Sequence, residues 1–316
     1  MATLTCTVPF ATIVFEFDPL LRIGDSTVRY ETLGLAGAAL VGILLAAMLA
    51  GRTASPHPRG GVPDPVLHPA DAHLRRDDLL FIVLGIVPGA VIGGRIGYVL
   101  LHLDFYTANA SAILDPSQGS LELGLAVLGG LLTGAYVARL LDAPVGRWLH
   151  VAAVPVFLAI ALGEVARILG GSGQGSPSDA AWSTAYLGPG PWGSLGPAIP
   201  SDPSQAYGAI AAAVAFIGVG VVLWLGGFGG ATGSAFFVAL LMWAIGRVAV
   251  TTTWRDEPVL GPIPAGGIIA MGIAAAAVVG LWLARWNAGR VRFQAHEGPT
   301  PPDGPAWPQP EDRPRF

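Results

Sequence analysis

Apolar runs of about 20 residues recur along this chain, each long enough for an α-helix to cross a hydrocarbon core of roughly 30 Å. Lipid offers the backbone no hydrogen-bond partners, so each run is expected to be helical throughout. The pattern predicts an all-α, polytopic membrane protein with about seven transmembrane helices. The expected spans are residues 31–51, 79–103, 121–141, 149–170, 206–227, 232–253 and 263–285.

The stretches between these runs predict three parts. Residues 1–30 form an outer N-terminal segment, which has no basic start and is not expected to be a cleavable signal peptide. Residues 31–285 form the seven-helix transmembrane domain, with a long outer loop at 171–205. Residues 286–316 form a Pro-rich cytoplasmic tail. The Pro-, His- and Asp-rich stretch at 53–78 is expected to be a solvated linker.

Composition supports a membrane protein. Of the 316 residues, 53% are hydrophobic and 12% are charged, whereas a soluble chain carries about twice that share of charge. The formal net charge is −4, and we expect no nucleic-acid partner. Cys6 is the only cysteine, and the linker histidines His57, His68 and His73 are irregularly spaced among prolines. We therefore expect neither a disulfide framework nor a metal site, and no cofactor.

Arginines alone decide the predicted orientation, because the chain contains no lysine. If the N-terminus lies outside, eleven arginines flank the spans on the inner side and three flank them on the outer side. This bias predicts an external N-terminus and a cytoplasmic C-terminus in a bacterial plasma membrane. The inner set is Arg52, Arg59, Arg75, Arg76, Arg139, Arg147, Arg285, Arg290, Arg292, Arg313 and Arg315, and the outer set is Arg22, Arg29 and Arg255.

The three remaining arginines, Arg95, Arg167 and Arg247, fall inside the spans, and so does Glu164. The predicted orientation places all four in the outer third of the bilayer. Each charge costs roughly 2.5–3.5 kcal/mol on insertion scales, so partners or ligands are expected. One interpretation is structural: the arginines extend to the interface, and Glu164 pairs with Arg167 on one helix face.

The other interpretation is a binding site. Tyr30, Gln205 and Tyr207 belong to other segments and are expected at the same depth. The planar guanidinium group of arginine suits phosphate and carboxylate, and the outer leaflet offers phospholipid phosphates at that level. The pattern therefore favours a site for an anionic lipid headgroup at the outer face.

Six short motifs follow one another along the chain. They are Phe17-Asp18-Pro19 with Val28-Arg29-Tyr30, then Gly93-Gly94-Arg95-Ile96-Gly97-Tyr98, Gly129-Gly130, Gly170 to Gly175, Asp202-Pro203-Ser204-Gln205-Ala206-Tyr207, and Gly246-Arg247. In this order, over about residues 8–285, they resemble the motifs of the prolipoprotein diacylglyceryl transferases. The residues that match the family pattern are Arg95, Tyr98, Gly129, Gly130, Gly175, Ser204, Gln205, Tyr207 and Arg247, together with Tyr30.

This resemblance implies an enzyme that transfers diacylglyceryl from phosphatidylglycerol to the lipobox cysteine of a prolipoprotein signal peptide and releases glycerol phosphate. It implies a catalytic role for Arg247, and we expect Arg167 and Glu164 to be catalytic beside it. It also implies headgroup contacts, by Arg95, Tyr30, Tyr98, Gly129, Gly130, Gln205 and Tyr207. The glycines fit equally well as sites of close helix packing.

Several positions depart from the family pattern. Leu128 stands where the family has histidine, Glu164 where it has arginine, and Arg167 where it has asparagine. Asp202, Trp243 and Thr251 replace a histidine, a tyrosine and an acidic residue. Arg167 is expected to take over phosphate binding, and Glu164 is expected either to act as a base or to neutralise Arg167.

Two further functions remain as alternatives. A degenerate relative would bind anionic lipid or signal helices without transfer. A transporter would need charges near the midplane and paired broken helices, and these charges lie off-centre. In the outer loop, Trp182, Tyr186 and Trp192 are expected to anchor at the interface, and a lid over the headgroup site is the other interpretation.

Overall fold

The structure is a computed structural model that describes residues 12–53, 74–115, 121–228 and 232–296. Seven of its helices are long and apolar enough to cross a membrane. No boundary of these spans differs by more than four residues from the sequence prediction, which confirms the all-α polytopic class. The helices are α1 (Tyr30–Ala50), α2 (Arg76–Leu101), α4 (Leu123–Leu140), α5 (Val145–Ile168), α6 (Ser204–Trp224), α7 (Ser234–Thr251) and α8 (Ala265–His296), of which Ala265–Trp286 is the candidate span.

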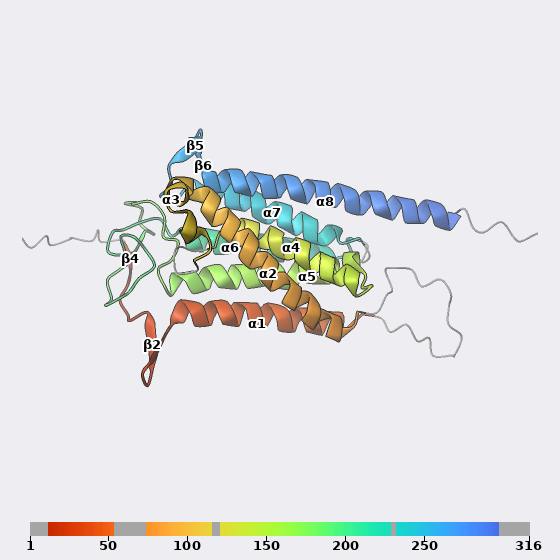
Figure 1. Ribbon diagram of the computed structural model, residues 1–316, viewed down its shortest axis with the longest axis horizontal. Helices are drawn as coiled ribbons and strands as arrows, with labels where there is room; N and C mark the ends of the chain where they lie inside the picture. Colours follow the sequence, from red (N-terminus) through yellow and green to blue (C-terminus); the bar gives the residue numbers. More distant parts are fainter. Residues whose placement is uncertain (1–11, 54–73, 116–120, 229–231, 297–316) are drawn as a thin grey trace, which may run out of the picture.

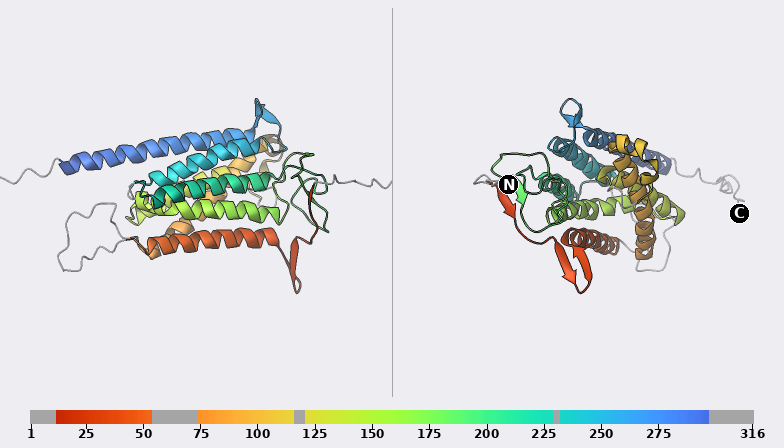
Figure 2. Two further views of the ribbon diagram at one scale, coloured as in Figure 1. Left: turned by 180° about the vertical axis from the view of Figure 1, so that it is seen from behind. Right: turned by 60° about the vertical axis from the view of Figure 1, so that its left-hand side comes forward.

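The helices lie side by side, from α1 at one edge of the bundle to α8 at the other, and α2 crosses the others obliquely (Figure 1). Helix α1 packs on α5, α5 on α6, α6 on α7 and α7 on α8, while α2 packs along α4. The segment before α1 and three of the connections between helices lie at the same end of the bundle (Figures 1 and 2). They are residues 12–29, 102–115, 169–203 and 252–264. We call this end the loop end.

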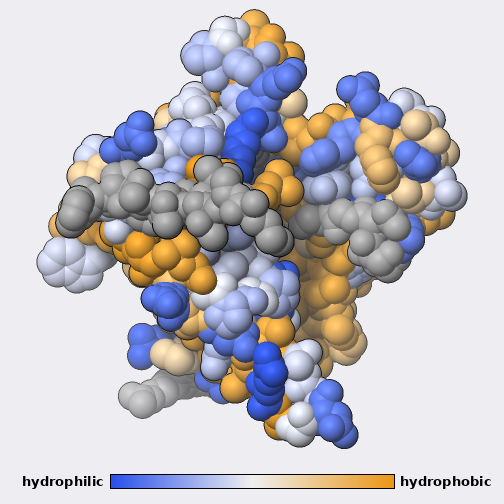
Figure 3. Space-filling view, turned by 90° about the vertical axis from the view of Figure 1, so that its left-hand side faces the viewer, coloured by the Kyte–Doolittle hydropathy of each residue, from blue (hydrophilic) through white to orange (hydrophobic). Residues whose placement is uncertain are grey.

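Short irregular elements build the loop end. Three two-stranded sheets and two short helices were not predicted, because none of them has an apolar run of its own. Hydrophilic residues cover much of this end, with hydrophobic patches between them (Figure 3). The elements are β1 (Ile13–Phe15) parallel to β4 (Thr184–Tyr186), β2 (Leu20–Ile23) antiparallel to β3 (Ser26–Arg29), β5 (Pro258–Leu260) antiparallel to β6 (Ile263–Pro264), and the helices α3 (Leu103–Ala108) and η2 (Ala110–Ile113).

Glycines allow α2 and α4 to approach closely. A Cβ atom added to Gly129 would lie 3.0 Å from the carbonyl carbon of Gly89 and 3.2 Å from the Cα of Gly93. A Cβ added to Gly130 would lie 3.0 Å from the side chain of Ile86. Of the two interpretations of the Gly129-Gly130 pair, these contacts favour helix packing, and a headgroup contact stays a prediction.

The predicted linker is shorter than the sequence indicated. Helix α2 begins at Arg76, so Asp77 and Asp78 lie in its first turn, where carboxylates interact favourably with the positive end of the helix dipole. The expectation that these two residues belong to a solvated linker was wrong. Cys6, the linker histidines and the tail beyond residue 296 lie outside the described residues.

Candidate active site

Four buried or half-buried charges from three helices meet at the loop end. Arg247 of α7 donates from Nη2 to Glu122 Oε1 at 2.8 Å. Its Nη1 lies 4.0 Å from Glu164 Oε1. Glu164 of α5 in turn accepts from Nη1 of Arg167 at 2.9 Å, which confirms the predicted pairing within that helix. We call Glu122, Arg247, Glu164 and Arg167 the ion-pair network.

Local structure explains where these residues lie. Glu164 and Arg167 are three residues apart near the C-terminal end of α5, so they share one helix face. Arg247 lies one turn before the end of α7. Each helix therefore holds its charge about one turn below the loop end. That depth agrees with the sequence prediction for the three residues.

Glu122 joins the network as the N-cap residue of α4. Its carboxylate accepts from the backbone N–H groups of Gly124 at 2.7 Å and Leu125 at 2.6 Å. Its own N–H donates to the carbonyl of Gly94 in α2 at 2.8 Å. A Cβ on Gly97 would lie 2.8 Å from the Cβ of Glu122, so a glycine is needed there. Glu122 thus ties α2, α4 and α7 together.

Arg247 is the most enclosed cation of the network, with 7% of its side chain exposed. The guanidinium carbon lies 5.5 Å from the ring centroid of Trp243 and 5.2 Å from that of Trp254, at distances typical of cation–π contacts. Its Nε–H has no hydrogen-bond partner within the described part of the chain. A buried donor of this kind is costly unless a ligand satisfies it.

Arg167 is the accessible cation, with 32% of its side chain exposed. The backbone of Gly173 passes against its guanidinium group, and Gly173 has a left-handed φ of +79°. A Cβ atom at Gly173 would fall within 2.8 Å of the guanidinium carbon. The loop after α5 therefore wraps around Arg167 closely while leaving part of it open.

Arg95 lies in a different environment. It donates to the carbonyl oxygens of Ala112 at 2.6 Å, Ile113 at 2.7 Å and Asp115 at 3.0 Å, and it packs over the ring of Tyr106. These bonds hold the turn that follows α3. The expected convergence of three arginines is therefore reduced to two, because Arg167 and Arg247 share Glu164 whereas Arg95 bonds to the 112–115 segment.

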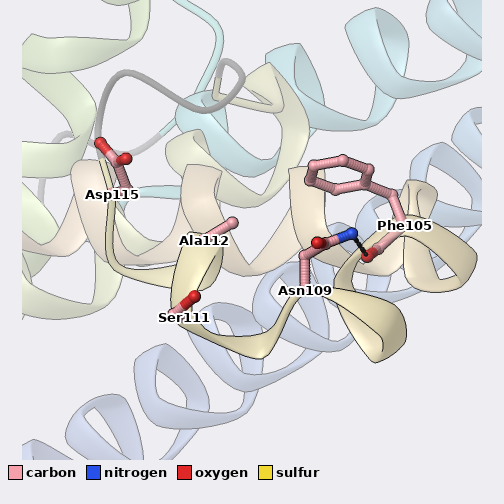
Figure 4. Close-up of a pocket in the computed structure, with 5 residues that line it drawn as sticks. All are labelled: Phe105, Asn109, Ser111, Ala112 and Asp115. Atoms are coloured by element: carbon pink, nitrogen blue, oxygen red, sulfur yellow. Dashed lines mark hydrogen bonds between the residues drawn. The ribbon is translucent and has the colours of Figure 1, made fainter.

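A shallow pocket of about 330 Å³ lies on this segment (Figure 4). It is lined by Phe105, Asn109, Ser111, Ala112 and Asp115. Asn109 donates to the carbonyl of Phe105 at 3.0 Å. The lining offers one carboxylate and no cationic side chain, so it suits an anionic headgroup poorly.

Four other predicted headgroup residues each make a different contact. Gln205 is buried and donates to the hydroxyl of Tyr186 at 2.9 Å, while its Oε1 has no partner among the described residues. Tyr207 accepts from Trp182 at 2.6 Å. Tyr30 packs edge-on against Phe17. In addition, Tyr98 stacks on His102, on the Arg95 side of the molecule beside Tyr106.

Tyr186 is a core residue of the loop and not an interfacial anchor. The residue is 1% exposed, and its ring stacks on Phe15 at 5.1 Å and lies tilted against Trp192 at 4.8 Å. Burial raises the pKa of Tyr186 to about 12, although the hydrogen bond from Gln205 acts in the opposite direction. The interfacial expectation for this tyrosine was wrong, whereas Trp182 is largely exposed.

Two residues that match the family pattern fasten the loop to α7. The N–H of Gly175 donates to the carbonyl of Asp202 at 2.7 Å, and Arg255 donates to the carbonyl of Gly175 at 2.7 Å. The hydroxyl of Ser204 lies 2.6 Å from that of Thr253. Gly175 and Ser204 therefore act in the seam between loop 171–205 and the end of α7.

Sequence reasoning missed Glu122. Its carboxylate lies at the head of a predicted span, two residues before a glycine, which is a position where an acidic side chain caps a helix. The depth criterion that selected Arg247 and Glu164 would also have selected Glu122 if it had been applied to the residues that begin each span. In the described residues, no group of three or more His, Cys, Asp and Glu side chains could hold a metal ion.

These features define a multi-pass membrane protein whose buried charges gather at one end of a helical bundle. The family model of prolipoprotein diacylglyceryl transferase matches residues 20–286. The chain belongs to this family of bacterial membrane transferases.

Named relatives agree. The phosphatidylglycerol–prolipoprotein diacylglyceryl transferase of Brucella anthropi is 26% identical over 289 residues, which cover 89% of this chain and 96% of the relative. The protein of that name from Nostoc is 26% identical over 273 residues, covering 84% and 88%. That of Geobacter sulfurreducens is 29% identical over 140 residues, which span 43% of this chain and half of the relative.

Proposed function

We propose that this chain transfers a diacylglyceryl group from phosphatidylglycerol to the lipobox cysteine of bacterial prolipoproteins. One observation carries the proposal: Arg167 and Arg247, from different helices, flank the same carboxylate of Glu164 at the loop end. Two guanidinium groups at this spacing suit a phosphate group with two free oxygens. Family membership over residues 20–286 supports the reaction.

The chemistry requires a thiolate and a stabilised leaving group. The cysteine sulfur attacks the glyceryl carbon that bears the phosphoester oxygen, so a C–S bond forms as the C–O bond breaks. The electron pair leaves with glycerol phosphate, which gains one negative charge. Arg167 and Arg247 would stabilise that charge in a site largely removed from water. Glu164 would take the thiol proton, because the thiolate is the reactive form.

The membrane orientation belongs to the same proposal. With the N-terminus outside, the loop end faces the external surface, which is where phosphatidylglycerol headgroups and secreted precursors meet. The excess of arginines at the other end of the bundle supports this orientation. Both substrates would reach the site sideways from the bilayer, since lipid and signal helix each lie within it.

The test is a transfer assay in phosphatidylglycerol vesicles with a lipobox peptide. Arg247→Ala and Arg167→Ala are each expected to abolish transfer. Arg22→Ala serves as the matched control, because Arg22 is exposed and pairs with Asp18 outside the ion-pair network, and its transfer rate is expected to stay at the wild-type value. If the wild-type protein binds the lipid but transfers nothing, the alternative of a degenerate relative is favoured. The replacement of the family histidine by Leu128 is the observation that motivates this alternative.

A further inference from the structure

The two carboxylates of the ion-pair network are held in different ways. Glu122 accepts three hydrogen bonds of 2.6–2.8 Å, two from the α4 backbone and one from Arg247. Glu164 accepts one, from Arg167, and lies 4.0 Å from Arg247. Among the described residues, backbone groups therefore fix Glu122, whereas arginine side chains alone hold Glu164.

The network is electrically balanced before any lipid arrives. It contains two carboxylates and two guanidinium groups, so it offers an incoming phosphate no excess positive charge. Glu164 occupies the position between Arg167 and Arg247, which is where a phosphate would bind both cations. A phosphate and the carboxylate of Glu164 repel each other at such a separation. One of them must give way.

The surroundings favour displacement of Glu164. On its α6 side the carboxylate of Glu164 faces Gly208, which has no side chain to block movement of the carboxylate. An added Cβ at Gly208 would lie 3.1 Å from the carboxyl carbon. Arg247 keeps an unpartnered Nε–H among the described residues, so it has a donor to spare for a new ligand. Arg167 is the exposed member of the network and gives a phosphate access from the loop end.

We propose that Glu164 is a displaceable counter-ion, which the phosphate of an anionic lipid replaces between Arg167 and Arg247. The released carboxylate then accepts the thiol proton. As the C–S bond forms and the phosphoester C–O bond breaks, the electron pair passes to the departing glycerol phosphate. The proton on Glu164 passes to that phosphate as it leaves, and the carboxylate returns to the arginines. This inference rests on the proposed function.

The experiment compares two changes of identical chemistry, Glu164→Gln and Glu122→Gln, in the full chain in phosphatidylcholine nanodiscs. Binding of dihexanoyl phosphatidylglycerol is measured by calorimetry without peptide, and turnover is then measured with a lipobox peptide. Glu164→Gln is expected to lower Kd about tenfold, because the competing charge is gone. It is also expected to lower kcat by about 10²–10⁴-fold, because the proton acceptor is lost.

Glu122→Gln is expected to weaken lipid binding. It releases Arg247 from its anchor, so Kd should rise while kcat falls. Dihexanoyl phosphatidylcholine provides the ligand control, since a zwitterion should gain nothing from either change. A second measurement uses the wild-type chain alone: infrared difference spectra of protein with carboxyl-labelled glutamate should show one carboxylate band shifting when dihexanoyl phosphatidylglycerol binds.

The possible results separate the displacement of Glu164, the proton transfer and the proposed function. An unchanged or higher Kd for Glu164→Gln would show that this carboxylate braces the arginines and is not displaced. A silent infrared spectrum would overturn the displacement even if that variant does not fold. A lower Kd with unchanged kcat would overturn the proton transfer alone. If wild type binds the lipid but never transfers, the proposed function fails, whereas the Kd comparison still decides the displacement.

Discussion

Replacing Glu122 by leucine tests whether this residue anchors the site. The substitution leaves Arg247 buried with its closest counter-ion removed and leaves the first N–H groups of α4 without their cap. Breaking a buried ion pair on one side costs about 3–5 kcal/mol, and loss of a helix cap costs about 1 kcal/mol. Together these predict a loss of about 4–6 kcal/mol in the free energy of unfolding, a large fraction of the roughly 5–15 kcal/mol typical of folded proteins.

The assay is reversible unfolding in mixed micelles, combined with a double-mutant cycle. Glu122→Leu and Arg247→Leu are measured singly and together. The double variant is expected to be about 2–3 kcal/mol more stable than the sum of the single losses predicts, because neither charge is then left unpaired. Glu164 and Arg167 remain to balance each other. A loss below about 1 kcal/mol for Glu122→Leu, or additive effects in the cycle, would refute the pairing with Arg247.

Three other changes test separate contacts. Gly173→Ala should destabilise the protein by about 1–3 kcal/mol and slow transfer, because φ is left-handed there and the new methyl group meets Arg167. The control Gly37→Ala has open space and should be neutral or slightly stabilising in the same unfolding and transfer assays. Tyr186 has its pKa raised by burial to about 12, so its contribution to stability is complete below about pH 10 and is lost between about pH 10 and 12. Tyr186→Phe should remove that alkaline loss of stability, and equal losses in wild type and variant between about pH 10 and 12, measured by unfolding, would contradict it. Leu128→His should raise the transfer rate, because it restores an imidazole at the family position, and an unchanged rate would mean that histidine's task has moved to another group.

Much of the fold follows from the sequence because the bilayer restricts it so strongly. An apolar run of about 20 residues has one viable conformation in lipid, so its length alone locates each helix. The pairing of β1 with β4 was not predictable in this way. It joins Ile13 to Thr184 through short segments with no pattern of their own, and only the assembled bundle brings them together.

The level of the site residues along their helices was predictable from the sequence, whereas the directions of their side chains were not. Sequence position gives the level of Arg95, Arg167 and Arg247 along their helices, and the structure confirms that all three lie near the loop end. Which way each side chain points depends on how its helix is rotated against its neighbours. Packing of α2 along α4 turns Arg95 toward the carbonyls at 112–115 and brings Glu122 toward Arg247 instead.

Growth of a bacterium depleted of its own prolipoprotein diacylglyceryl transferase tests the central claim most directly. The wild-type chain is expected to restore growth and lipoprotein maturation, as is Arg22→Ala, whereas Arg247→Ala and Arg167→Ala should fail at equal expression. Restoration of growth by both of these site variants would contradict the claim that paired guanidinium groups at the loop end hold the lipid phosphate for transfer.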